Sequence, residues 1–412
     1  MNIFSQNIER FIINRKNLFY LGLILTISLS LQQVMQGKER NFFIFAYSTV
    51  DFWKGINVYS HQWSSHYGLD YYLYGPLFNI LFTPFAYLPR WLGPIVWNIF
   101  NYTLYFISIF SLPKKFSERE KCMTYLYTML ILAATQLEFQ YNATVAYLFI
   151  FAYILLEKNK SFLAIVIILI SGFTKIYGIF ELSLLLFYPN FKKNIFYVFL
   201  ISLIAFLMPL LRIYPNNLLD YYGIWIHYLG EHNITRTWDT IFYLKFMFPN
   251  PPTKMYLFQL GSLLILAIMV LMNRKRYHDE NFRVQSLGIL MGWVILFSSS
   301  AERHTYVIAL LGYAIWYWTI EPKKVDKILF WLNFIILIVM PIDVLCPPKI
   351  MLYVHETLNL NLWLFLFTLS RMIYITLLSD IIFILKLSKD PIVQKATLLT
   401  RCISNYFSSN NH

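Results

Sequence analysis

Long runs of apolar residues, separated by short polar and charged segments, dominate the sequence from Leu18 to Leu385. A chain that repeats such runs many times is typical of a helical membrane protein. The runs predict helices over residues 17–35, 91–112, 122–137, 143–156, 161–173, 176–188, 194–211, 255–272, 284–299, 304–320, 328–344 and 361–386. We therefore expect an all-α polytopic membrane protein, a bundle of about 12 transmembrane helices that forms a single domain over residues 1–412.

Composition agrees with this class. The chain is 58% hydrophobic and 13% charged, whereas soluble domains carry about 25% charged residues. The net charge of +13 could indicate a nucleic-acid partner, but the basic residues gather in short loops that alternate along the predicted helices. These loops are 114–121, 158–160, 192–193, 274–283 and 323–327. The pattern follows the positive-inside rule, so we expect a cell membrane protein (plasma or inner) with both termini in the cytoplasm and no nucleic-acid partner.

Two short apolar regions do not fit a simple crossing. Segment 76–89 is bracketed by Pro76 and Pro89, and a full crossing would move the basic loop 114–121 to the outside. We expect it to be a re-entrant or interfacial helix. The short helices 161–173 and 176–188 should form a hairpin, which a membrane tolerates where its backbone is buried in protein or wetted by a cavity.

Two long loops should face the outside, over residues 36–90 and 212–254. Both mix aromatic side chains with isolated charges and amides, and together they could cover a cleft open to lipid and to water. The three cysteines have no metal-ligand spacing, and there is no nucleotide-phosphate loop. We expect no metal site and no cofactor.

Asp51, in the first outer loop, is the sharpest candidate for chemistry. A glycosyl transfer needs a carboxylate that takes the proton of the acceptor hydroxyl. The alternative is a solvated aspartate that caps a short helix beginning at Phe52. We interpret the nearby Asp70, which is flanked by turn-forming residues, as structural.

Several cations could hold an anionic lipid phosphate. Lys175 stands at the tip of the short hairpin, where a charge at membrane depth is a functional candidate; it could instead snorkel or pair with Glu181. Arg303 and His304 follow Glu302 at the outer end of a helix pair. Arg303 could clamp the phosphate, and His304 could bind it or donate to the leaving oxygen. The alternative is a polar turn in which Glu302 and Arg303 pair with each other. Arg371 is a further candidate for binding the phosphate. We interpret Glu138 as a structural partner of one of these cations.

Residues expected to bind the sugar or the acceptor are scattered over both outer loops. Aromatic rings can stack on sugar faces, although most rings in such loops belong to a belt at the headgroup level. The predicted set is Trp53, Tyr59, Tyr74, Glu302, His232 and Arg236.

Three stretches of the first outer loop carry a resemblance. They read Asp51-Phe-x-x-Gly55-x-x-Val58-Tyr59, Tyr72-Leu-Tyr74-Gly75-Pro76-Leu77-Phe78 and Thr83-Pro84-Phe85-Ala86-x-Leu88-Pro89. In this order they resemble the first outer loop of glycosyltransferase family 87, part of the GT-C superfamily. The family commonly shows Tyr-Pro-Pro at Tyr74-Gly75-Pro76, and Lys-Pro at Lys175-Ile176.

The resemblance implies a GT-C-type bundle with interfacial helices in the first outer loop. It also implies an inverting transferase that moves a sugar, with mannose expected, from a polyprenyl-phosphate donor to a glycan or glycolipid acceptor at the outer face. Asp51 would be the general base, and Lys175, Arg303 and His304 would hold the donor phosphate. We expect Asp51, Lys175 and His304 to converge on one cavity. The alternatives are a transporter or flippase of lipid-linked sugars and a non-catalytic member of the family.

Overall fold

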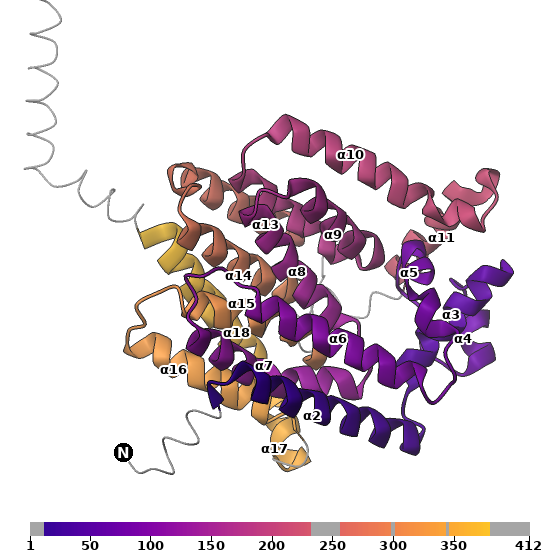
Figure 1. Ribbon diagram of the computed structural model, residues 1–412, viewed down its shortest axis with the longest axis horizontal. Coiled ribbons are helices and arrows are strands. Elements are labelled where there is room, and N and C mark those ends of the chain that lie inside the picture. Colours follow the sequence, from indigo (N-terminus) through magenta and orange to yellow (C-terminus); the bar gives the residue numbers. More distant parts are fainter. Residues whose placement is uncertain (1–11, 232–255, 298–300, 343–345, 380–412) are drawn as a thin grey trace, which may run out of the picture.

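The computed structural model describes residues 12–231, 256–297, 301–342 and 346–379, and all regular structure in these ranges is helical (Figure 1). Below, α marks α-helices, and η marks 3₁₀ or π segments. The first half contains α2 (Arg15–Gln36), α3 (Arg40–Lys54), α4 (His61–Tyr67), α5 (Pro76–Ala86), α6 (Gly93–Phe110), α7 (Glu118–Leu137), α8 (Asn142–Glu157), α9 (Ser161–Thr174) and η1 (Ile176–Phe187). The all-α class is therefore confirmed for the described residues.

The second half of the described chain continues in the same way. Its elements are α10 (Phe191–Leu207), η2 (Met208–Leu211), η3 (Pro215–Asn217), α11 (Leu218–Glu231), α13 (Tyr256–Met272), η4 (Arg274–Arg276), α14 (Glu280–Leu296), η5 (Arg303–Thr305), α15 (Tyr306–Tyr317), α16 (Lys324–Asn333), η6 (Phe334–Val339), α17 (Pro348–Leu352), η7 (Tyr353–Thr357), α18 (Leu360–Ile373) and η8 (Tyr374–Leu378).

Each of the 12 expected helices has a counterpart in the described residues, although the expected ends of 284–299, 328–344 and 361–386 fall outside them. The expected number of membrane crossings is not established. In the described part of the chain, three helices are both long and apolar enough to cross a membrane: Arg15–Gln36, Phe191–Leu211 and Leu360–Leu378. The others are shorter, for example 16 residues in α8 and 14 in α9. Segment 76–89 does form a helix, α5, as expected.

Large apolar side chains on the outer helices face away from the protein. Phe199 on α10 is 66% exposed, and Leu264 on α13 is 61% exposed. Figure 1 shows α10 along one flank of the bundle. An apolar surface of this kind needs an apolar environment, so the structure, like the composition, indicates a membrane protein.

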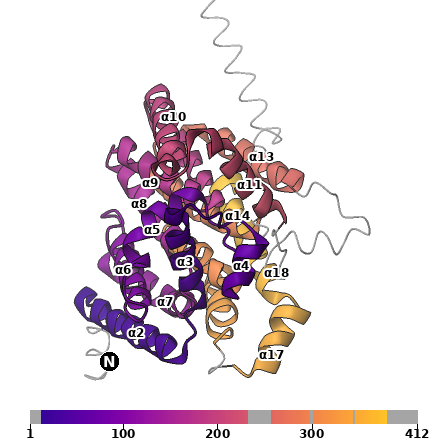
Figure 2. The same ribbon diagram turned by 90° about the vertical axis from the view of Figure 1, so that its right-hand side faces the viewer.

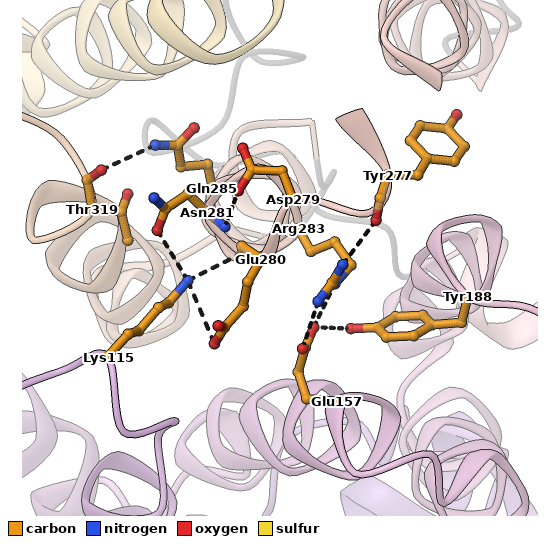
Figure 3. Close-up of polar contacts among 10 residues, drawn as sticks. All are labelled: Lys115, Glu157, Tyr188, Tyr277, Asp279, Glu280, Asn281, Arg283, Gln285 and Thr319. Atoms are coloured by element: carbon orange, nitrogen blue, oxygen red, sulfur yellow. Dashed lines mark hydrogen bonds and ion pairs between the residues drawn. The ribbon is translucent and has the colours of Figure 1, made fainter. Parts of the chain in front are cut away.

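The loops expected on the cytoplasmic side do gather at one end. The guanidinium of Arg283 makes two hydrogen bonds to the Glu157 carboxylate, Nε to Oε1 at 2.6 Å and Nη2 to Oε2 at 2.7 Å (Figure 3). Tyr188 donates to the same Oε1 at 2.6 Å. Lys115 donates to the Glu280 carbonyl at 3.1 Å. These contacts join the loop before α7, the end of α8, the residue after η1 and the start of α14.

The segments expected outside gather at the other end, where α3, α4, α5 and α11 lie together (Figures 1 and 2). Trp225 of α11 donates to the Leu73 carbonyl at 3.3 Å, and the Gly75 N–H donates to the Thr174 carbonyl at 3.1 Å. The loops joined by these contacts therefore lie in two groups at different ends of the bundle, and the side of the membrane that each end faces stays a prediction.

The first outer loop is largely helical. Residues 40–54 form α3, which ends at Gly55 in the left-handed region (φ 82°). Arg212 covers this end: its Nε donates to the Trp53 carbonyl at 2.7 Å and its Nη2 to the Lys54 carbonyl at 2.9 Å. A cation at a helix C-terminus satisfies unpaired carbonyls and opposes the negative end of the helix dipole. Asp51 thus lies inside the last turn of α3, and the interpretation as a cap of a helix beginning at Phe52 is wrong.

Candidate functional site

A cavity of about 400 Å³ lies among the segments expected outside. Its size is typical of a small-molecule site. Five segments line it: α3, the stretch after α4, the loop between α7 and α8, the tip of the α9–η1 hairpin and the start of η5. The lining residues are Asn41, Ile44, Phe45, Asp70, Tyr71, Leu73, Tyr74, Glu138, Gln140, Asn142, Lys175, Glu302, His304 and Thr305.

Lys175 lies at the junction of α9 and η1, outside both helices. Its ammonium donates to the Asn142 Oδ1 at 2.6 Å and lies over the rings of Tyr177 at 4.9 Å and Tyr74 at 5.6 Å. Burial lowers the pKa of Lys175 to about 8, against the opposing effect of the Glu302 charge. The expected alternative, a pair with Glu181, is not among the ion pairs of the described residues.

The start of α8 supplies the partner of Lys175, and the loop before it completes this side of the cavity. Asn142 begins α8, and its Oδ1 also accepts from the Tyr177 hydroxyl at 3.1 Å. Phe139 in this loop is fully buried with φ 50°, a conformation that costs free energy for a bulky residue. The Asn41 amide holds the loop to α3 by donating to the Glu138 carbonyl at 2.8 Å. The loop therefore holds Glu138, Gln140 and Asn142 against the cavity.

The side chains of the Glu302-Arg303-His304 segment point in two directions. Glu302 and His304 line the cavity, and His304 is 9% exposed. Arg303 is absent from the lining and donates from Nη1 to the Pro341 carbonyl at 2.8 Å. Of the expected phosphate-binding groups, the structure brings Lys175 and His304 to one cavity and turns Arg303 elsewhere.

Asp51 is 2% exposed, and its carboxylate accepts three hydrogen bonds. Tyr67 donates its hydroxyl to Oδ2 at 2.7 Å, Trp63 donates its indole N–H to Oδ2 at 3.0 Å, and Lys54 donates to Oδ1 at 3.1 Å. Burial alone would raise the pKa of Asp51, but these bonds outweigh burial and lower it below its usual value. The carboxylate is therefore held ionised.

Asp51 does not line the cavity, so the expected convergence with Lys175 and His304 is wrong for this residue. An aromatic wall lies between them. The Trp63 ring is 6.5 Å from Tyr72, and the Tyr72 ring is 5.9 Å from the cavity-lining Tyr74. Tyr72 is fully buried. The sequence could not show this wall, because its rings resemble the surface aromatics of any outer loop.

Other predicted residues have structural partners. Trp53 donates its indole N–H to the Thr83 hydroxyl at 2.8 Å, and Tyr59 donates its hydroxyl to the Tyr74 carbonyl at 2.8 Å. Neither lines the cavity, whereas Tyr74 does. His232 and Arg236 fall outside the described residues.

Arg371 is not brought to the cavity either. Its Nε donates to the Asp326 Oδ1 at 2.8 Å and its Nη2 to Oδ2 at 3.2 Å. Asp326 also accepts from the Lys323 backbone, at the start of α16 and in a loop expected to be cytoplasmic. Arg371 thus forms an ion pair with Asp326. The sequence could not predict this pair because the two residues are 45 positions apart.

Sequence reasoning missed several polar residues of the cavity. Asp70 and Glu138 were interpreted as structural, yet both line it, and Asp70 also lies 3.7 Å from Arg40. Asn41, Gln140 and Asn142 were not singled out. The polar run around Glu138 was the available signal, since polar residues at the end of an apolar helix need a partner.

The cavity combines two kinds of chemistry. Lys175 and His304 can bind an anion, and carboxylates and amides can bind hydroxyl groups. A comparison with protein families agrees with this combination: the model of glycosyltransferase family 87 matches residues 72–299, more than half of the chain. The chain belongs to glycosyltransferase family 87.

The family 87 match covers Glu138, Asn142 and Lys175 but begins after Asp51 and ends before His304. Membership makes the protein a glycosyltransferase with a sugar donor and an acceptor. No curated protein and no solved structure matches the chain in the same comparisons.

Proposed function

We propose that this family 87 protein is an inverting transferase that moves a sugar from a polyprenyl-phosphate donor to a glycan or glycolipid at the outer membrane face. The observation that carries the proposal is the shared lining of one cavity by Lys175, His304 and hydroxyl-binding side chains. A sugar phosphate has matching parts, an anion at one end and hydroxyls at the other. We further propose that the sugar is mannose, which the family resemblance implies.

In this proposal Lys175 and His304 bind the donor phosphate. An ammonium acts on a phosphate as a point charge, and a buried imidazole can hydrogen-bond a phosphate oxygen. Because these groups stabilise the charge that develops on the leaving phosphate, the reaction needs no metal ion and no cofactor. The lipid tail would extend from the cavity into the bilayer.

Asp51 is the proposed base. Its carboxylate takes the proton of the acceptor hydroxyl as that oxygen attacks the anomeric carbon, and the bond to the phosphate breaks with its electron pair staying on the polyprenyl phosphate. One displacement inverts the anomeric configuration. Asp51 lies seven residues after Ile44 on α3, and so on the same helix face about 10 Å further along the axis.

In the proposal the substrate bridges the cavity and Asp51. The sugar and the attacking hydroxyl would occupy the interval between the phosphate and the carboxylate. The Tyr72–Tyr74 wall fills part of this interval, so the proposal requires these rings to move when both substrates bind.

A transporter or flippase of lipid-linked sugars is the second candidate, because short, interrupted helices such as the α9–η1 hairpin also occur in transporters. The two functions differ in their product. A transferase forms a glycosidic bond, whereas a flippase returns its substrate unchanged in the other leaflet.

The test uses purified full-length protein in proteoliposomes with radiolabelled polyprenyl-phosphate-mannose and a membrane lipid extract as acceptor. We expect a new labelled glycan or glycolipid, and no product from a nucleotide-linked mannose. Label that crosses the bilayer without entering a new product would instead establish transport. Product formed from the nucleotide donor would overturn the lipid-phosphate donor.

A further inference from the structure

We infer that Trp63 and Tyr67 are positioning residues that hold Oδ2 of Asp51 and leave Oδ1 as the atom that meets the acceptor hydroxyl. This inference rests on the proposed role of Asp51 as the base. Neither residue was expected to have this role from the sequence.

The two oxygens of Asp51 have different partners. Each carboxylate oxygen can accept two hydrogen bonds. Oδ2 receives both of its bonds from α4, from Trp63 at 3.0 Å and Tyr67 at 2.7 Å. Oδ1 receives one bond from Lys54 at 3.1 Å. Oδ2 is therefore saturated, and Oδ1 keeps capacity for a hydroxyl.

The partners also differ in how firmly they are held. Trp63 is 5% exposed, whereas the Lys54 side chain is 58% exposed. The Tyr67 ring packs on Tyr47 with centroids 4.8 Å apart. An exposed lysine exchanges its partner at little cost, whereas a packed indole does not. An incoming hydroxyl would thus bind Oδ1 beside Lys54 or in its place and leave the bonds to Oδ2 intact.

Helix α4 is built to hold these two donors. It has only seven residues, but Ser60 caps its start by accepting from the Trp63 N–H at 3.1 Å, and it ends at Gly68 with φ 62°. Arg40, at the start of α3, donates to the Gly68 carbonyl at 2.8 Å. Both ends of α4 are satisfied, so its donors face the last turn of α3 in a fixed position.

The chemistry of the donors suits a base. Both are neutral, so they orient the carboxylate without competing for the proton. Burial and the bond to Asp51 raise the pKa of Tyr67 to about 12, so its hydroxyl stays protonated. Fixing a base through a second group is a general way to orient it.

The experiment compares the pH dependence of kcat/KM for purified Tyr67→Phe, Trp63→Phe and a matched Tyr47→Phe control. The control removes a hydroxyl from the same aromatic stack without touching Asp51. The charged and titratable groups around Asp51 are Lys54, Tyr67 and Arg212, which donates to the carbonyls at the end of α3. All three side chains are retained in Trp63→Phe.

When a carboxylate loses a hydrogen-bond donor, the pKa of the carboxylate rises. Fewer molecules then carry an ionised base at low pH. We expect the acid limb to move to higher pH by about one to two units in Tyr67→Phe, and in the same direction in Trp63→Phe. We also expect kcat to fall and the donor KM to stay constant, with Tyr47→Phe like the wild type.

Acid limbs of both variants that superimpose on the control would overturn the inference. Failure of the proposed function gives a different result. If Asp51→Asn is fully active, Asp51 is not the base, whatever the profiles of the Tyr67 and Trp63 variants. If Tyr67→Phe does not fold, the Trp63→Phe profile alone decides.

Discussion

The backbone N–H of Gly75 donates to the carbonyl of Thr174 at 3.1 Å, and this contact ties the first outer segment to the hairpin that carries Lys175. The approach is close: a Cβ at position 75 would collide with the Phe173 carbonyl oxygen. Family 87 commonly has proline at this position and another after the lysine, where this chain has Ile176. Both departures from the family pattern therefore lie at one junction.

Gly75→Ala should be destabilising, because the added Cβ meets backbone rather than a side chain that can move. We expect a loss of roughly 2–3 kcal/mol in the free energy of unfolding, measured by thermal unfolding in detergent. Gly75→Pro should cost at least as much, since it also removes the N–H. Gly223→Ala in α11, where a Cβ meets nothing within 4 Å, is the control and should be neutral or stabilising. Equal stability of all three variants would show that the junction is not tight.

Lys175 should make donor binding depend on pH. The ammonium form binds phosphate, and the pKa of Lys175 is about 8, so the free protein loses this charge as pH rises through 8. The donor phosphate is a diester and stays anionic. We expect donor affinity to fall above about pH 8, by up to tenfold per unit, as measured by calorimetry or donor KM.

Lys175→Arg should remove this alkaline decline, because a guanidinium keeps its proton. Lys175→Met should weaken donor binding by about tenfold or more at neutral pH, whereas Lys158→Met, in the basic loop between α8 and α9, should not. An unchanged donor KM in Lys175→Met would exclude Lys175 from the phosphate site.

Lys54 lowers the pKa of Asp51, as Trp63 and Tyr67 do, but unlike theirs its loss should favour acceptor binding. Because it occupies Oδ1, the atom assigned to the acceptor, Lys54→Met should lower the acceptor KM by about two- to fivefold, the range expected from losing an exposed ion pair. Steady-state kinetics with varied acceptor measures this. A tenfold or greater loss of kcat would instead make Lys54 part of the catalytic machinery.

The Glu157–Arg283 pair should hold the other end of the bundle together. Both side chains are 14% exposed, so a neutral partner leaves a largely buried charge. We expect Glu157→Gln to cost about 2–4 kcal/mol of stability, seen as a lower Tm in detergent. Asp70→Asn, in a pair with Arg40 whose side chains are 74% and 57% exposed, should cost less than about 1 kcal/mol. Similar losses from both variants would contradict a special role for the buried pair.

The helices could be predicted because hydrophobic runs and basic loops are local signals, and α8 and α9 lie within a residue of their expected ranges. Helix α3 was not predicted, since its mixture of aromatic and polar residues resembles a loop. The cavity was only partly predictable. Lys175 and His304 stood out as charges at helix ends, but the partners of Arg371 and Asp51 depend on packing between segments far apart in the chain.

The most direct test of the account is the single-turnover rate of glycosyl transfer by purified Asp51→Asn. The amide has almost the same shape and can still accept from Trp63 and Tyr67, so the fold should survive while the base is lost. We expect the rate to fall by at least about 10²–10⁴-fold with donor binding unchanged, while exposed Asp220→Asn transfers sugar at the wild-type rate. Asp51→Asn that transfers sugar as fast as the wild type, with Glu302→Gln inactive, would contradict the account and place the base inside the cavity.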